Sequence, residues 1–526
     1  MSDSWKTEFL GALTSNAIRF ESHGAASSAP VLEIEVSPDE WKPVAVACRS
    51  RESRFAGLWG DQRDDGFSVH GLYELAGGYL HVSTVLVNEA PRIVSLSDVF
   101  TGAGRLERHM HDLLGILVDG GDERRWTRHQ GWRREHYPLR HDFPLLGFPP
   151  RRAPSDLNYP FRDIRGDGVY QIPVGPIHAG IIEPGHFRFQ AVGEDVLRLE
   201  TRLGYVHKGI EKLAVGRDAQ GLARLAGRVS GDSTVAHTWA ACQAMERAVH
   251  CHLPPRALVL RALLCERERI ANHIGDIGAI CNDVGFTFAH VQCSRLRELW
   301  LRRSAELFGH RLLMDSIVPG GVGVDLDARA IAMLMADHEQ LRRETATLFD
   351  IVQDHPSLDD RLIGTGVLKA EDARALGCTG YVGKASGVPF DVRVHAPYPP
   401  YDDLSLQTPA LSEGDVAARV LVRMQETAQS LDVLDQLLEK IPPGSIAAEM
   451  TTTGGGAEGF GMVDGWRGEI ICFVRFGGQG RIARYFPRDP SWFTWLALER
   501  LIHGNIVPDF PVCNKSVNAS YSGHDL

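Results

Sequence analysis

Residues 254–281 read PPRALVLRALLCERERIANHIGDIGAIC, and this stretch decides the fold of the larger part of the chain. Its apolar side chains recur every three or four residues, which is the spacing of one face of an α-helix. Two prolines stand at its start, where the first turn of a helix tolerates them. The stretch therefore predicts a long helix whose apolar stripe packs into a core. The stripe consists of Leu260, Leu263, Leu264, Ile270, Ile274 and Ile277.

Patterns around this helix predict a mainly helical domain with small β elements over residues 169–526. Residues 413–440 predict a second long helix, with Ser412 as its N-cap and two prolines beyond its end. Residues 457–487 return to the apolar–polar alternation that is typical of strands. Proline and glycine break residues 172–189 into a predicted β-hairpin.

Residues 1–145 predict a separate small α+β domain. Residues 31–36 alternate as a strand does, and residues 79–87 are rich in β-branched side chains and could pair with them. Residues 106–117 have helical periodicity. Proline and glycine are frequent over residues 146–168, which predicts a connector that lies on the surface between the two domains.

The composition is that of an ordinary globular chain of 526 residues, long enough for two to four domains. Its net charge of −11 argues against nucleic acid as the main partner, since phosphate binding favours a basic surface. None of its nine cysteines is spaced as Cys-x-x-Cys, which argues against an iron–sulfur cluster in this chain. No signal peptide and no run of about 18 apolar residues is found. We therefore expect any link to a membrane to run through partner subunits.

Residues 228–237 read RVSGDSTVAH and contain two serines, Ser230 and Ser233. The run resembles the Arg-x-Cys-Gly-x-Cys-x-x-x-His signature of nickel–iron hydrogenase large subunits, with serine in place of both cysteines. Ser520 and Gly523 occupy the places of that family's second Cys-x-x-Cys. A serine hydroxyl is a hard ligand that stays protonated at neutral pH, whereas nickel requires thiolates. The resemblance therefore implies a subunit of the hydrogenase large-subunit type that lacks the nickel–iron centre.

Further motifs extend the resemblance over nearly the whole chain. Residues 203–212 read LGYVHKGIEK and are similar to the signature of the complex I subunit of about 49 kDa, termed 49K. Residues 107–116 resemble the signature helix of the complex I subunit of about 30 kDa, termed 30K. The chain resembles a fusion of the two, as also found in the large subunit of formate hydrogenlyase, a group 4 nickel–iron hydrogenase. This implies an α+β fold, with a 30K-like domain over residues 1–145 and a domain like 49K and the hydrogenase large subunits over residues 169–526. The other matching runs are 138–144, 175–178, 183–186, 271–273, 380–393, 465–469 and 488–491.

In complex I, the cavity that lost the metal is a chamber for the quinone headgroup, where a hairpin histidine lies near an aspartate of a later helix. The matching residues here are His186, or alternatively His178, and Asp283. Such a pair can deliver a proton to a reduced quinone near neutral pH. A histidine bonded to the hairpin backbone and a helix-capping aspartate are the alternatives. Gly231 stands where complex I has a tyrosine that contacts the headgroup, so another small molecule, or only water, remains an alternative occupant.

Four more residues are candidates for the same cavity. Glu183 matches a glutamate of the hydrogenase proton route, and His237 follows the serine pair at the family's spacing. Arg228 and Arg467 match arginines that line the site, which makes them candidates for binding a cofactor. The alternatives are a solvated glutamate, a histidine packed in the core and surface ion pairs.

The resemblance implies a peripheral-arm subunit of a membrane-associated oxidoreductase complex, at the cytoplasmic face of the cell membrane. It would pass electrons from an iron–sulfur partner subunit to a quinone-like acceptor, and ion-translocating membrane subunits would be further partners. No covalently bound cofactor is expected. A complex that uses NADH would bind it on another subunit, because no dinucleotide-binding glycine fingerprint is found in this chain. A pseudo-enzyme scaffold without redox chemistry and an active formate-linked hydrogenase subunit stay open as alternatives.

Overall fold

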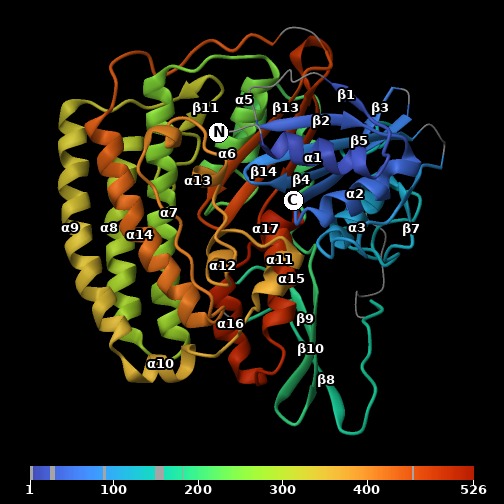
Figure 1. The fold of residues 1–526 in the computed structure, drawn as a ribbon. Helices are drawn as coiled ribbons and strands as arrows, with labels where there is room; N and C mark the ends of the chain where they lie inside the picture. The colour runs from blue at the N-terminus through green and yellow to red at the C-terminus, as the bar shows by residue number, and fades with distance from the viewer. Residues whose placement is uncertain are drawn as a thin grey trace.

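Figure 1 shows a sheet domain formed by the first part of the chain beside a larger, mainly helical domain formed by the rest. The structure is a computed structural model, and it describes residues 4–23, 30–64, 66–86, 90–148, 159–179, 182–452 and 455–526. Helices and strands are mixed in the order that the sequence predicts, so the α+β fold class is confirmed.

The N-terminal domain is built on a five-stranded sheet and the helices that cover it. Its elements are α1 (Ser4–Ser15), β1 (Glu21–His23), β2 (Val31–Glu35), α2 (Trp41–Ser50), β3 (Arg54–Arg63), β4 (Gly66–Leu75), β5 (Gly78–Leu86), β6 (Arg92–Val94), α3 (Ala103–Leu114) and β7 (Leu117–Asp119). The strand order of the sheet is β1-β2-β5-β4-β3. Val31 of β2 lies opposite Tyr79 of β5, so the predicted pairing of these strands is confirmed, although Val87 lies outside the described residues.

A three-stranded antiparallel sheet begins the second domain and extends below it in Figure 1. Its strands are β8 (Val169–Val174), β9 (His186–Val192) and β10 (Asp195–Arg202). The predicted connector precedes it. Residues 149–158 of that connector lie outside the described residues, and residues 159–168 contain neither helix nor strand.

Long helices form most of the second domain, and α7, α8, α9 and α14 stand side by side along one flank in Figure 1. The helices up to residue 439 are α4 (Ile210–Ala214), α5 (Ala219–Ala226), α6 (Thr234–Ala248), α7 (Pro255–Asp283), α8 (Thr287–Phe308), α9 (Ala328–Gln353), α10 (Pro356–Leu362), α11 (Ala370–Leu376), α12 (Gly380–Lys384), α13 (Val392–His395) and α14 (Val416–Glu439). The long helix predicted from residue 254 is confirmed as α7. The predicted N-cap Ser412 is wrong, because the Asp415 side chain accepts the bond from the Ala418 N–H (2.8 Å) that caps α14.

A second antiparallel sheet lies between α6 and the N-terminal domain. It consists of β13 (Glu458–Gly465), β14 (Gly468–Phe476) and β15 (Ile482–Arg488), which confirms the strands predicted there. Arg54 of β3 donates to both carboxylate oxygens of Glu469 at 2.8 and 2.7 Å, and this buried pair joins the two domains. The chain then forms α15 (Ser491–Leu501), α16 (Phe510–Val517) and α17 (Tyr521–Asp525). Within the described ranges, no helix has the length and apolar character needed to cross a membrane.

Candidate functional site

A cavity of about 650 Å³ lies between the β8–β9 loop, the segment before α6, the end of α7 and the segments around α16 and α17. The structure brings four of the seven predicted catalytic and cofactor-binding residues to its walls: His178, Glu183, Asp283 and Arg467. Ser230 and Ser520 from the two serine motifs lie on the same walls. Segments that are far apart in the sequence therefore meet at one site.

The two serine motifs are joined by hydrogen bonds in which the donor and the acceptor can each be assigned. Ser230 Oγ donates to Asp232 Oδ1 at 2.7 Å and lies 2.9 Å from Ser520 Oγ. Because Ser230 donates its only hydroxyl proton to a carboxylate, the Ser520 hydroxyl must be the donor between the two serines. Ser520 Oγ in turn accepts from the Gly523 N–H at 2.8 Å. Both hydroxyl protons are thus used within the protein.

Arg467 anchors this network through the carboxylate of Asp232. Its guanidinium donates to Asp232 Oδ1 and Oδ2 at 2.7 Å each, and to the Asn518 carbonyl at 2.7 Å. Such a two-pronged pair is strong and geometrically specific. Burial opposes ionisation of Asp232, but the guanidinium and the Ser230 hydroxyl together keep its pKa below the ordinary value. The wall at this point carries one cation matched to one anion.

These residues do not fit a nickel–iron centre. The predicted ligand positions hold Ser230, Ser233, Ser520 and Gly523, which offer three hydroxyls and no thiolate. A side chain at Gly523 would also meet resistance, because a Cβ there would stand 2.7 Å from the Asp489 carboxylate. Within the described ranges, no group of three or more His, Cys, Asp or Glu side chains is arranged to hold a metal.

His237 lies beneath the serine loop rather than on the cavity wall. Its Nε2 bonds Asp489 Oδ2 at 2.8 Å, and both side chains are fully buried. Asp489 also accepts from the Ser491 N–H at 2.8 Å. Burial disfavours the charged carboxylate, but His237 and Arg467 reverse this and keep the pKa of Asp489 well below its usual range. His237 therefore supports the floor of the site through Asp489.

His178 and Asp283 both line the cavity. His178 Nε2 lies 2.8 Å from the Gly185 carbonyl, so this nitrogen carries the proton and Nδ1 remains an acceptor. Removal of water from the carboxylate raises the pKa of Asp283, and the nearby Lys515 partly opposes this effect. Glu183 is exposed at the rim, where it accepts from the Ser522 N–H at 3.2 Å.

Two predicted site residues lie elsewhere. His186 does not line the cavity: it is buried on the other side of β9, where its Nδ1 lies 3.1 Å from the Gly175 carbonyl. Side chains alternate along a strand, and its neighbour Phe187 takes the cavity side. Arg228 also points away and pairs with Asp315 (2.8 Å), both side chains being about two-fifths exposed. The surface ion pair is therefore the correct interpretation of Arg228.

The sequence interpretation missed Tyr521, which lines the cavity from the first turn of α17. Its side chain is 8% exposed, and its ring packs on Trp495 with 4.6 Å between the centroids. Burial raises the pKa of its phenol to about 12, so it is a neutral hydroxyl at every physiological pH. Its place directly after Ser520 in the second motif was the signal that could have identified it.

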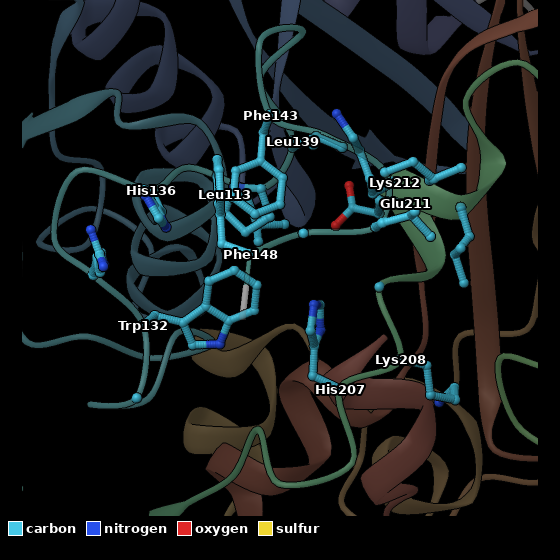
Figure 2. Close-up of a pocket in the computed structure, with 18 of the residues that line it drawn as sticks. Leu113, Trp132, His136, Leu139, Phe143, Phe148, His207, Lys208, Glu211 and Lys212 are labelled. Carbon is cyan, nitrogen blue, oxygen red and sulfur yellow. The ribbon is translucent and has the colours of Figure 1, made fainter. Parts of the chain in front are cut away.

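A second, mostly apolar groove of about 550 Å³ lies where the N-terminal domain meets residues 207–213. Figure 2 shows Trp132, Phe143 and Phe148 on one side of this groove and His207 on the other. Lys208 belongs to the groove and also donates to Ser522 Oγ of the cavity wall at 2.6 Å. The groove and the cavity are therefore neighbours, joined by the Lys208–Ser522 hydrogen bond.

The fold and the site define a class: fused subunits in which a 30K-type domain precedes a domain of the hydrogenase large-subunit type. Three family profiles match the chain in this order. They are "Respiratory-chain NADH dehydrogenase, 30 Kd subunit" over residues 34–149, "Nickel-dependent hydrogenase" over residues 208–275 and "Respiratory-chain NADH dehydrogenase, 49 Kd subunit" over residues 283–457.

Individual proteins give the same result. Formate hydrogenlyase subunit 5 of Escherichia coli (strain K12) is 32% identical over 80% of this chain and 74% of its own length. The fused C/D subunit of NADH-quinone oxidoreductase from Bacteroides fragilis is 31% identical over 80% of this chain and 83% of its own. A chain of the archaeal membrane-bound sulfane sulfur reductase superposes with a TM-score of 0.65 at 26% identity, covering 68% of this chain and 99% of that one. This chain belongs to the family of fused C/D-type subunits of complex I-like oxidoreductases and membrane hydrogenases.

Proposed function

We propose that this chain is the peripheral-arm subunit of a membrane-associated oxidoreductase complex and that its cavity binds a quinone-like electron acceptor. The observation that carries the proposal is the cavity itself. His178, Asp283 and Tyr521 surround a space of about 650 Å³ that contains hydroxyls instead of thiolates. A neutral, planar headgroup suits the part of the wall beside the serine motifs, because the Arg467–Asp232 ion pair there is already satisfied internally.

The residues around the cavity can supply the protons that a two-electron reduction consumes. Reduction of a quinone to a quinol takes up two electrons and two protons. Partial removal of water raises the pKa of Asp283, which favours this residue as the acid. His178 keeps Nδ1 free to accept a proton and present it toward the cavity, while the Gly185 carbonyl holds the ring in place. The Tyr521 hydroxyl can donate a hydrogen bond to a headgroup oxygen without ionising.

Electrons would come from an iron–sulfur partner subunit docked on the apolar groove of Figure 2. At the edge of this groove, Leu145, Leu146 and Phe148 are 62%, 99% and 52% exposed, which is unusual for large apolar side chains grouped together. Lys208 connects the groove to the cavity wall, so a partner seated there lies next to the acceptor. The membrane subunits would bind elsewhere on the complex, at the cytoplasmic side of the membrane.

Asp283→Asn in the purified complex tests the proposal. Loss of a general acid lowers turnover by about 10²-fold or more, and quinone-dependent turnover should fall to that extent. Asp432→Asn is the matched control, because this aspartate pairs with Arg342 on the exposed face of α14 and should leave turnover unchanged. Absence of quinone-dependent turnover in the unmodified complex would favour the scaffold role instead. Stoichiometric nickel in the purified protein would overturn the proposal in favour of a hydrogenase.

A further inference from the structure

The interior of the helical domain holds a second cluster of charges that the proposed function does not use. Four carboxylates and three cations meet between α7, α12, α13, α14 and β13, and each side chain is at most 1% exposed. The carboxylates are Glu266, Asp391, Glu426 and Asp464. The cations are Arg269, Lys384 and Arg393.

Three of the carboxylates share two cations through short ionic contacts. Arg393 donates to Asp391 at 2.7 Å and to Glu266 at 2.9 Å. Lys384 Nζ lies 2.6 Å from both Asp391 and Glu426. Of the three cations, Arg269 alone forms a direct ion pair with the fourth carboxylate, Asp464, at 3.4 Å.

Asp464 is the poorly matched member. Its Oδ2 accepts a backbone bond from the Val392 N–H at 3.1 Å, and its Oδ1 lies 3.4 Å from Arg269, which also contacts Glu266 at 3.2 Å. Burial and the neighbouring Asp391 raise the pKa of Asp464 to about 6. An unmatched charge in a protein interior is costly, so a carboxyl in this position takes up its proton at a higher pH than an exposed carboxyl does.

The other titratable groups around the cluster do not supply the missing charge. His273 Nε2 lies 2.6 Å from Glu426, but burial lowers the pKa of its ring, and it acts as a neutral donor. Tyr401 donates to Glu266 at 2.6 Å, and Tyr398 OH accepts from the Asp464 N–H at 3.2 Å. Cys265 is a neutral thiol whose pKa burial raises. His395 bonds the Asp391 backbone, and Arg423 is paired with Asp276 (3.1 Å).

One face of α7 connects this cluster to the cavity. Glu266, Arg269, His273 and Asp276 follow one another at spacings of three and four residues, and Asp283 lies two turns further on the same face. Asp276 accepts from the Asn518 side-chain amide at 2.8 Å, and Asn518 lines the cavity. Polar side chains therefore follow one face of α7 from the buried cluster to the exposed Asp283 at the proposed acceptor site, opposite the apolar stripe of the same helix.

We propose that Asp464 stores one exchangeable proton and that the polar face of α7 links this proton to the cavity. The link to the cavity rests on the proposed function, whereas the exchangeable proton on Asp464 does not. When Asp464 releases this proton, its carboxyl O–H bond breaks and the cluster changes from neutral to a net charge of −1. The proton is one of the two that quinone reduction consumes, while both electrons come from the partner subunit. Uptake of one proton from solvent restores the store.

Infrared difference spectroscopy of the purified complex tests the store without any quinone. Between pH 8 and pH 5, the wild-type difference spectrum minus that of Asp464→Asn should contain the carbonyl stretch of one protonated carboxylic acid, with a midpoint near pH 6; buried carboxyls such as Glu268, whose pKa burial raises to about 8, contribute to both spectra. Asp464→Asn keeps the shape and removes the acid, so this band should be lost. Asp432→Asn, on the exposed face of α14, should keep it. A band of equal size in Asp464→Asn, or none in the wild type, would overturn the assignment of the proton to Asp464.

The same spectra recorded during reduction of the complex with quinone present test the link to the cavity. Reduction should diminish the Asp464 band in the wild type. Asp276→Asn should keep the band in the pH difference spectrum but abolish its response to reduction. If the Asp464 band of the wild type does not change on reduction while quinone turns over, the proposed link between Asp464 and the cavity is wrong. If quinone does not turn over but the pH-dependent band is present, the proposed function is wrong, while the assignment of an exchangeable proton to Asp464 is supported.

Discussion

The cavity wall and the buried charge cluster are both rich in polar side chains, but they differ in how the charges are matched. At the cavity, Arg467 and Asp232 form one complete pair, and the serine hydroxyls donate within the protein. In the cluster, four carboxylates share three cations. The matched pair beside the serine motifs suits a neutral ligand, whereas the unmatched cluster suits a proton. The difference shows that a polar site should be interpreted from its charge balance and not only from its residue types.

The largest effect should come from breaking the cluster at Arg393. Arg393→Met leaves Asp391 and Glu266 without their common partner. Removal of one partner from a buried pair costs about 3–5 kcal/mol, and denaturant unfolding of the purified protein should show a loss of this size.

The control for this change is Arg228→Met, which removes the exposed pair with Asp315. An exposed ion pair contributes about 0–1 kcal/mol, so its loss should be small. Equal losses for the two variants would mean that burial does not separate the two kinds of ion pair in this protein.

Asp464→Asn should change the pH dependence of stability. The pKa of Asp464 is raised to about 6 in the folded chain, against about 3.9 in an unfolded one. Folding therefore favours the protonated form, and this contribution is complete below about pH 4 and lost as the pH rises through 6. The loss amounts to about 3 kcal/mol. Between pH 4.5 and 8, the stability of the wild type relative to Asp464→Asn should fall by about 2 kcal/mol of this total. Parallel curves for the two proteins would contradict the charge imbalance.

Substitutions of the two hairpin histidines compare a residue at the cavity, His178, with a buried residue on the other side of β9, His186. His178→Gln removes a group at the cavity and should lower quinone-dependent turnover by about 10²-fold. His186→Gln acts on the other side of β9 and should leave turnover within about twofold of the wild type, because an uninvolved group makes no transition-state contact. The reverse order would mean that His186 reaches the acceptor when the complex assembles.

Local patterns predicted α7 and the pairing of β2 with β5, because periodicity and β-branched side chains report directly on burial. The meeting of the two serine motifs followed from the family resemblance. What could not be predicted depended on register and on distant partners. The choice between His178 and His186 depends on which side of β9 a residue faces, and the partner of Arg228 lies 87 residues away. The polar face of α7 was visible in the sequence, but its partners on α12 and β13 were not.

The smallest expected effect concerns glycine. Gly523→Ala brings a Cβ to 2.7 Å from Asp489, and overpacking of this kind costs about 1–3 kcal/mol. Gly231→Ala meets nothing within 4 Å and should have little effect on stability. Thermal unfolding of the two variants would compare them. A stable Gly523→Ala protein would show that the floor of the cavity can make room for a side chain.

The most direct test is electron cryo-microscopy of the purified complex with a short-chain quinone analogue. We predict density for the headgroup in the cavity between His178, Asp283 and Tyr521, with Ser230 and Ser520 still bonded to each other. A headgroup bound elsewhere while this cavity stays empty, or metal density between the serine motifs, would contradict the proposed function.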